Sequence, residues 1–190
     1  MAGKCLIHIG REGKLTSEQV DGVFTLGDVG LAVKANLSVM RCLEAEIKTL
    51  EQVVKGRAKL KPAFRYLLTV SGIGQTLALT IMLETGDIRR FPSVGNFASY
   101  CRCVGSEKIS NGKRKGKGNT KNGNKYLSWA FVEAANFAIR YEPLIARFYQ
   151  RKKAKTHAVV AIKAVAHKLS RACYYVMRDE VPFDVGRAFA

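Results

Sequence analysis

The sequence is short of acidic residues, and their arrangement excludes one kind of catalytic site. Only 15 Asp and Glu residues accompany 32 Lys and Arg residues. Glu84 and Asp87 lie near each other, whereas the other acids of the C-terminal half are single and scattered. An enzyme that cuts phosphodiesters with two metal ions needs clustered carboxylates to hold them. We therefore expect helix-end and surface roles for Glu84 and Asp87, and we predict no metal ligand in this chain.

Long apolar runs are also missing. No stretch approaches the roughly 20 apolar residues that a membrane-spanning helix needs. The apolar run near the start, from Cys5 to Ile9, is too short for the core of a secretory signal. The sequence therefore predicts a cytoplasmic protein without a membrane partner.

Cysteines and histidines are too few and too irregular for a disulfide framework or a zinc site. The five cysteines are an odd number, and Cys101 and Cys103 lie closer than the usual zinc spacing. The three histidines, His8, His157 and His167, are far apart along the chain. We expect reduced thiols, buried or half-buried, and ordinary helical histidines.

What the sequence does contain is a core and a large positive charge. Hydrophobic residues make up 47% of the 190 residues, enough for a globular domain with or without a helical arm. The formal net charge is +17. Lys and Arg that neutralise phosphates release condensed counterions, so a charge of this size favours a polyanionic partner. Nucleic acid is the first candidate.

A long helix is predicted from Asp28 to about Lys59, where neither proline nor a turn cluster interrupts the chain. Two heptad positions recur along it, one with Val33, Met40, Ile47 and Val54 and the other with Asn36, Leu43 and Leu50. Both a coiled coil and a helix packed on its own domain fit this pattern. In a coiled coil the partner would be a second copy, with Asn36 helping to set the register.

A short glycine turn follows the break at Lys59 to Pro62. The residues around Phe64 lead into Ser71-Gly72-Ile73-Gly74, and a second helix runs from Gln75 to Glu84. Helix, Gly-x-Gly turn and helix form the helix-hairpin-helix pattern, in which the turn amides and the second N-terminus face a DNA phosphate. We predict phosphate binding by residues 72–75, with a purely structural turn as the alternative.

The rest of the chain alternates helices with one loop. Ser93 is the predicted N-cap of a short helix, and further helices run from Lys125 to the residues before Pro143, from Leu144 to about Lys153, and from about Thr156 to Arg178. Strand signals are scarce, so the predicted fold is all-α or nearly so. The predicted parts are an N-terminal segment (1–27), the long helix (28–61) and a compact helical domain (62–185).

The segment from Gly105 to Asn124 interrupts the helical periodicity and is predicted to be a loop. Its length favours a functional role over a simple connection. Glu107 is its only acid, and it contains glycines at 105, 112, 116, 118 and 123 and the cations Lys108, Lys113, Arg114, Lys115, Lys117 and Lys121.

Ser110 is the residue of this loop that could carry chemistry. A serine hydroxyl can attack a phosphodiester if a base takes its proton and nearby cations stabilise the developing charge. The loop supplies cations and no evident base. On the residues alone, a serine here more often hydrogen-bonds a phosphate than attacks it.

Four motifs in order resemble the C-terminal domain of a known family. They are the run Leu67 to Gly74, the run Glu84 to Ile88 with Phe91, the run Ser110 to Lys113, and the run Thr120 to Leu127. Together they resemble the Piv/MooV-type DNA invertases and the insertion-sequence transposases called bridge-RNA-guided recombinases. The resemblance extends from the long helix to about Phe183.

This resemblance implies specific roles for the chain. Family members carry a RuvC-like domain that binds a divalent metal such as Mg²⁺, then a coiled coil used in oligomerisation, then this helical domain with a catalytic serine. Ser110 matches the serine of the family's Ser-Gly-Gly-Lys motif, and Asn111 replaces its first glycine, which a left-handed backbone tolerates. No RuvC-like sequence precedes the long helix. We therefore expect no cofactor in this chain and DNA binding without cleavage by the chain alone.

The main hypothesis is a transposase or site-specific recombinase domain that binds DNA, and a structured guide RNA in some members, and supplies Ser110 as nucleophile. The predicted nucleic-acid contacts are Gly72, Ile73, Gly74, Gln75, Lys108, Lys113, Arg114, Lys115, Lys117, Lys121, Asn122 and Asn124. One alternative is a non-catalytic helical module that holds DNA or RNA through the same loop. Another is a dimerising scaffold whose basic surface only aids assembly.

Overall fold

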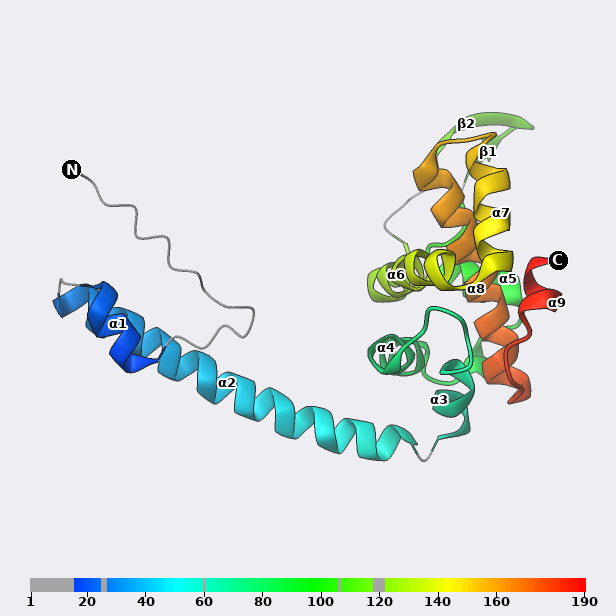
Figure 1. Ribbon diagram of the computed structural model, residues 1–190. Helices are drawn as coiled ribbons and strands as arrows, with labels where there is room; N and C mark the ends of the chain where they lie inside the picture. Colours follow the sequence, from blue (N-terminus) through cyan, green and yellow to red (C-terminus); the bar gives the residue numbers. More distant parts are fainter. Residues whose placement is uncertain (1–15, 25–26, 60, 106, 118–121) are drawn as a thin grey trace. The chain divides into compact units, whose positions relative to one another are not determined.

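The computed structural model describes residues 16–24, 27–59, 61–105, 107–117 and 122–190 (Figure 1). The chain divides into two compact units, Met1–Val54 and Lys55–Ala190. The described residues are mostly helical, and one two-stranded hairpin is the exception. The predicted all-α or nearly all-α fold is confirmed.

The described residues of unit 1 form two helices. Helix α1, Ser17–Val23, begins with a capping box in which the Thr16 hydroxyl accepts from the Gln19 N–H and the Gln19 side chain accepts from the Thr16 N–H. Helix α2, Gly27–Lys59, continues into unit 2 and covers the predicted long helix. Val20 of α1 is fully buried, and the Lys34 ammonium of α2 donates to Asp21 of α1 at 2.6 Å. The Lys34–Asp21 ion pair joins the two helices.

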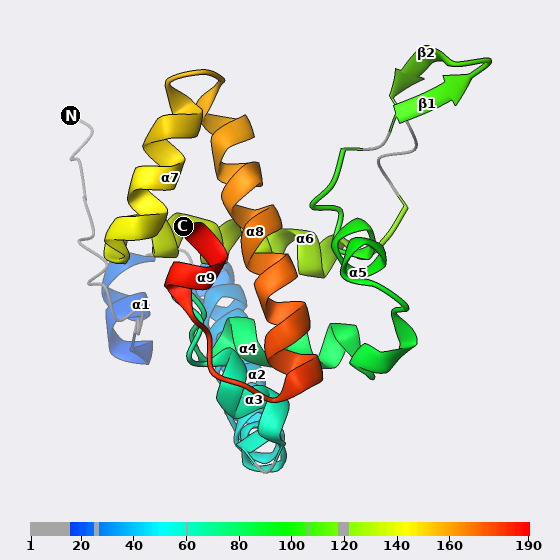
Figure 2. The same cartoon turned by 90° about the vertical axis from the view of Figure 1, so that its right-hand side faces the viewer.

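Unit 2 is a bundle arranged around its longest helix. Its elements are α3 (Pro62–Leu67), α4 (Gln75–Thr85), the 3-10 helix η1 (Ile88–Arg90), α5 (Val94–Tyr100), α6 (Lys125–Tyr141), α7 (Pro143–Lys153), α8 (Ala158–Asp179) and α9 (Val185–Phe189). Helix α8 packs against α3, α5, α6 and α7, with α9 against its outer side (Figure 2). Prolines start α3 and α7, where the missing N–H costs nothing.

An aromatic cluster fills the centre of unit 2. Phe97 is fully buried, and its ring meets those of Phe91, Phe131 and Tyr174 at centroid distances of 5.2, 6.3 and 5.9 Å. The Tyr174 hydroxyl donates to the Phe91 carbonyl at 3.1 Å, which satisfies its polar end inside the core. This cluster fixes η1 and α5, which lead to the segment that was predicted as a loop.

That prediction was wrong for the middle of the segment 105–124. Strands β1 (Glu107–Ser110) and β2 (Lys113–Lys117) pair antiparallel there, with Ser110 opposite Lys113. The reason is the Asn111-Gly112 pair, whose φ values are 51° and 70°. Positive φ at both central residues is the type I′ geometry whose twist matches that of the flanking strands. Asn-Gly is a strong hairpin signal. The hairpin was not predicted because the residues on either side of Asn-Gly do not alternate between apolar and polar.

The thiols in the described residues are all free. Cys101 and Cys173 are buried, Cys103 is half-buried and Cys42 is exposed, while Cys5 lies outside the described residues. Burial raises the pKa of all three core thiols, that of Cys103 to about 11. These three are protonated packing residues at neutral pH and have the predicted burial, whereas Cys42 is exposed and does not. None of the described helices is both long enough and apolar enough to cross a bilayer.

Candidate nucleic-acid interface

Ser110 lies at the tip of the hairpin, directly before its two-residue turn. Ser110, Asn111, Gly112 and Lys113 are all exposed. Residues that pair directly across an antiparallel ladder have Cβ atoms about 5 Å apart on the same face. The pairing of Ser110 with Lys113 therefore brings a hydroxyl and an ammonium to one face of the tip. A phosphate placed there would meet both groups.

The other predicted cations of the segment follow the ladder. Lys117 pairs with Glu107, Arg114 with Ile109, and Lys108 with Gly116. The register shifts between Lys108 and Ile109, so Lys115 has no partner of its own and forms a bulge, with its side chain exposed. The side chains of Lys108, Arg114 and Lys117, and the whole of Lys121, lie outside the described residues.

The base of the hairpin is tied to the bundle by hydrogen bonds that the sequence did not reveal. The side chain of Arg102, at the end of α5, donates to the Gly123 carbonyl at 2.8 and 3.1 Å. Gly123 has φ 93°, and a Cβ there would lie 2.5 Å from the Tyr100 carbonyl oxygen. Only glycine fits this close approach. Residues 102 and 123 thus hold the two legs of the hairpin together.

Asn124 is predicted as a nucleic-acid contact, and the structure gives its side chain three internal hydrogen bonds. It is the N-cap of α6, where Oδ1 accepts from the N–H groups of Tyr126 and Leu127 at 2.8 and 3.0 Å. Its Nδ2 donates to the Glu84 carboxylate of α4 at 2.6 Å. A cap of this kind is readable from a sequence, as Asn before an apolar helix. Its neighbour Asn122 is exposed.

Tyr100 and Arg90 complete this junction. Hydrogen bonds from Asn124 and then from Arg90 are the main causes that lower the pKa of the Tyr100 hydroxyl. The Arg90 guanidinium also lies over the Tyr100 and Phe91 rings, at 4.8 and 4.5 Å from their centroids. The junction couples α4, η1, α5 and α6 at the base of the hairpin.

The predicted glycine turn joins α3 to α4, and its four residues have different surroundings. Gly72 has φ 85°, and a Cβ there would lie 2.2 Å from the Ala134 carbonyl oxygen of α6. Ile73 is only 5% exposed, in the core, and its N–H already donates to the Val70 carbonyl. Gly74 is the N-cap of α4 without a side-chain cap, and Gly74 and Gln75 are exposed. Any phosphate would therefore meet Gly74 and Gln75, since Gly72 faces α6.

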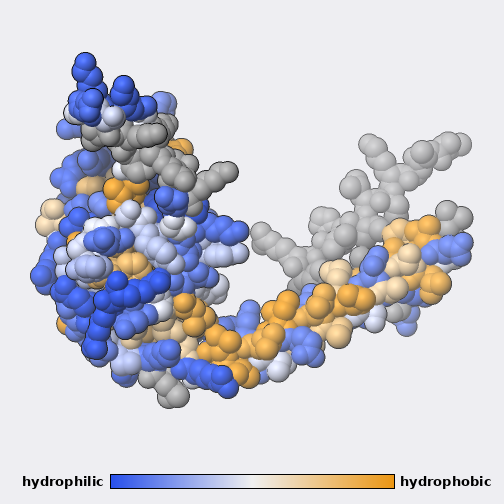
Figure 3. Space-filling view, turned by 180° about the vertical axis from the view of Figure 1, so that it is seen from behind, coloured by the Kyte–Doolittle hydropathy of each residue, from blue (hydrophilic) through white to orange (hydrophobic). Residues whose placement is uncertain are grey.

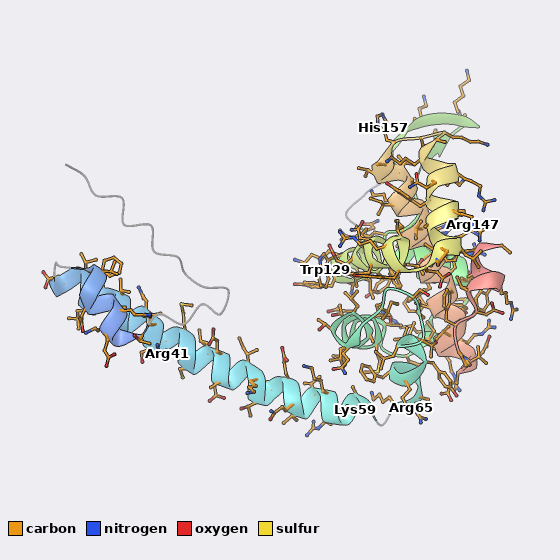
Figure 4. All side chains as sticks on the ribbon, in the orientation of Figure 1. Arg41, Lys59, Arg65, Trp129, Arg147 and His157 are labelled. Atoms are coloured by element: carbon orange, nitrogen blue, oxygen red, sulfur yellow. The ribbon has the colours of Figure 1, made fainter. Side chains whose placement is uncertain are left out.

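The described residues supply no base and no metal centre to Ser110. Its hydroxyl forms no hydrogen bond within them, and they hold no cluster of three or more metal-ligating residues. Asp87 caps η1 through the Arg89 N–H, and Glu84 binds Asn124, in line with their predicted structural roles. His157 lies at the N-cap of α8 (Figure 4) and His167 within α8, while His8 lies outside the described residues.

The α3–α4 turn and the hairpin both lie in the part of the chain that matches a known protein family. Residues 64–150 match the sequence model of the Transposase IS116/IS110/IS902 family, a range that runs from α3 into α7. A relative from Streptomyces coelicolor, the insertion element IS110 uncharacterized 43.6 kDa protein, is 23% identical over 164 residues. The alignment covers 85% of this chain and 40% of the relative, so the chain spans less than half of that protein's length.

Proposed function

We propose that this chain is the DNA-binding and serine-bearing part of a transposase that moves an insertion element. The observation that carries the proposal is the family match over 64–150, because it includes both the α3–α4 turn and the basic hairpin. The resemblance noted above matches Ser110 to the family's catalytic serine. The hairpin presents this serine exposed, at a tip with an ammonium on the same face.

The proposed reaction at Ser110 is a transesterification. The Ser110 oxygen attacks a DNA phosphorus and forms a phosphoserine ester, one phosphorus–oxygen bond to the sugar breaks, and the freed sugar hydroxyl takes up a proton. The serine proton goes to a base outside the described residues, and Lys113 stabilises the charge on the phosphoryl oxygens. The resemblance implies that a RuvC-like domain would hold Mg²⁺, which would supply electrostatic stabilisation of the phosphate.

DNA binding is proposed to use two contacts of unit 2. The exposed cations Lys113 and Lys115 bind phosphates by charge. The uncapped N–H groups at the start of α4 add a helix-terminal phosphate contact at Gly74 and Gln75. A structured guide RNA, which the resemblance implies for some members, would meet the same cations.

Assembly is proposed to use the exposed seam of α2. Met40, Leu43, Ile47, Leu50 and Val54 repeat at spacings of three and four, and each is between 38% and 64% exposed. They form an apolar band along the helix (Figure 3). Mostly β-branched residues at one heptad position with Leu at the other favour a parallel two-stranded coiled coil. We propose a homodimer through this seam, and Leu43→Ser with Leu50→Ser should reduce the mass measured by light scattering to that of one chain.

The experiment that tests the proposed function is covalent capture of DNA. The full chain, a RuvC-like domain of the resembled family with Mg²⁺, and labelled DNA that contains this gene and its flanks are incubated and separated under denaturing conditions. We expect a protein–DNA adduct that Ser110→Ala abolishes while the DNA affinity stays within about twofold. Lys48→Ala, an exposed α2 change, is the control and should keep the adduct. Retention of the adduct in Ser110→Ala would overturn the role of the serine, and binding without any adduct would favour the non-catalytic alternative.

A further inference from the structure

A second group of cations surrounds α9, away from the residues assigned to DNA above. A cavity of about 610 Å³ lies between the C-terminal half of α8 and residues 181–188. Figure 2 faces this region, with α9 in front of α8. The volume lies within the range of about 300–1,000 Å³ that is typical of small-ligand sites. We call it the α9 cavity.

The walls of the α9 cavity differ in chemistry. Its cationic wall consists of Lys168, Arg171 and Arg187, and His167 also lines the cavity. Its aromatic and apolar wall includes Tyr175, Val181 and Phe183, and Tyr175 is 40% exposed. Such a pairing fits a ligand that is anionic at one end and flat and apolar at the other.

The cationic wall continues into a neighbouring cavity. That cavity, of about 250 Å³, shares Lys168 with the α9 cavity and adds Arg151, Lys152 and Lys155 from α7 and the turn after it. Arg147 extends from the same helix one turn earlier (Figure 4). The cations of the two cavities, without His167, are Arg151, Lys152, Lys155, Lys168, Arg171 and Arg187.

These cations have few acidic neighbours, although Arg187 adds to the larger effect of Arg178 in lowering the pKa of Asp179. Asp184 is the only acidic side chain among the described residues that line either cavity, and it caps α9 by accepting from the Arg187 N–H at 3.1 Å. Within the described part of the chain, none of the six side chains forms an ion pair with an acid. Six cations with few acidic side chains near them give both cavities a positive potential.

The surroundings of Lys168 show the effect of these clustered positive charges. Its ammonium donates to the Ala188 carbonyl at 2.9 Å and lies over the Phe148 and Phe189 rings at 4.9 and 5.3 Å, so its place is fixed. Burial, and then repulsion by Arg151, Lys152 and Arg171, lowers the pKa of Lys168. Burial and Arg171 also lower the pKa of His167. A bound anion would relieve repulsion that the protein leaves uncompensated.

We propose that the α9 cavity binds one unpaired nucleotide of a single-stranded nucleic acid. The base stacks on the wall of Tyr175 and Phe183, and the adjoining phosphates follow the cations into the neighbouring cavity. Single-strand sites combine a positive groove with aromatic stacking platforms, whereas a paired base cannot leave its duplex without cost. The inference rests on the proposed function, because it adds a second nucleic-acid contact, one that binds unpaired strands, to the proposed DNA-binding residues.

Binding of two labelled probes by the full chain tests this inference. The probes are a fluorescein-labelled oligothymidine of about 15 nucleotides and a duplex of the same length, followed by anisotropy across a salt series. Arg171→Gln with Arg187→Gln should weaken single-strand binding about tenfold and reduce the salt slope by about 1.4. Tyr175→Leu should weaken it about fivefold with the slope unchanged. Duplex binding should change less than about twofold in both variants.

Matched controls separate site binding from general charge. Lys48→Gln with Arg140→Gln removes the same charge elsewhere, and Tyr141→Leu removes an exposed aromatic residue of α6. The charge-preserving pair Arg171→Lys with Arg187→Lys should keep the salt slope, and thermal unfolding confirms that each variant is folded. Equal losses in the controls would overturn the inference. If inorganic pyrophosphate competes fully and Tyr175→Leu has no effect, the proposal that the cavity binds a nucleotide base would be overturned, and the cavity would be a phosphate site.

The outcome also separates this inference from the proposed function. Lys113→Gln with Lys115→Gln should weaken duplex binding and leave the contribution of Tyr175 to single-strand binding intact. Loss of duplex binding in that hairpin variant, with no single-strand effect of the α9 variants, would refute only the inference. Loss of single-strand binding in the α9 variants, with no serine adduct in the capture experiment, would refute only the proposed catalysis.

Discussion

The α3–α4 turn and the hairpin turn use glycine for opposite reasons. Both contain a glycine with positive φ, Gly72 at 85° and Gly112 at 70°. An added Cβ would meet the α6 backbone at Gly72, whereas it would meet nothing within 4 Å at Gly112. Gly72 is thus required by packing and Gly112 by the local turn alone. Four sets of substitutions in and around these two turns should have unequal effects.

Gly72→Ala should have the largest effect on folding. The new methyl group must move the α6 backbone and also occupy a left-handed conformation, so the free energy of unfolding should fall by about 4 kcal/mol. Urea denaturation followed by circular dichroism measures it. Gly74→Ala is the matched control, because nothing lies within 4 Å of its Cβ position and its φ is −91°. A similar small loss in both variants would contradict the packing role of Gly72.

Asn124→Ala should come next, through the junction below the hairpin. It removes the cap of α6 and the hydrogen bond to Glu84, which together should cost about 2 kcal/mol of unfolding free energy. Asn124→Ser should recover about half of the loss, since serine also caps helices. The same urea experiment checks both variants. An unchanged midpoint together with weaker DNA binding would show that Asn124 is a nucleic-acid contact after all.

Removing charge at the hairpin tip should affect binding and not stability. Lys113→Gln with Lys115→Gln deletes two exposed cations, so the slope of log affinity against log salt for duplex DNA should fall by about 1.8. Affinity near physiological salt should drop about tenfold. Anisotropy with a labelled duplex measures both quantities, with Lys48→Gln plus Arg140→Gln as the equal-charge control. A salt slope equal to that of the unaltered protein would exclude the tip as a phosphate contact.

Gly112→Ala should have the smallest effect on the whole molecule. The positive φ strains the turn by about 1 kcal/mol, but the strands pair with each other, so the strain should stay local. We expect the thermal midpoint of unit 2 to shift by less than about 1 °C and duplex affinity to fall less than threefold. A large fall in the midpoint would mean that the hairpin supports the bundle.

Helices could be predicted from this sequence because their signals are local. Ser93 caps α5 as predicted, helices are interrupted where breaks were predicted at Pro62 and before Pro143, and the heptad positions of 28–59 lie within α2. The hairpin was missed because its strands carry cations in place of alternating apolar residues. Asn-Gly at 111–112 was the available signal.

The candidate site was predictable only where function depends on local composition. Ser110 and its cations stand out as a basic, glycine-rich segment. The α9 cavity does not, because Arg151, Lys168 and Arg187 lie on three different helices and come together only after α7, α8 and α9 pack. The same holds for the close approach of Gly72 to Ala134. These residues are 62 positions apart, and the sequence around neither residue predicts the contact.

The bond between Arg102 and the Gly123 carbonyl closes a loop, and this closure has an entropic consequence. Its ends are 21 residues apart in the chain. Bringing together the ends of a flexible segment of this length costs about 3 kcal/mol of chain entropy, by the logarithmic law of loop closure. The folded bundle bears that cost before any partner arrives. Under the proposed function, a nucleic acid that binds the hairpin would meet a segment whose two ends are already held together, whereas a free basic tail would lose that end-to-end freedom on binding.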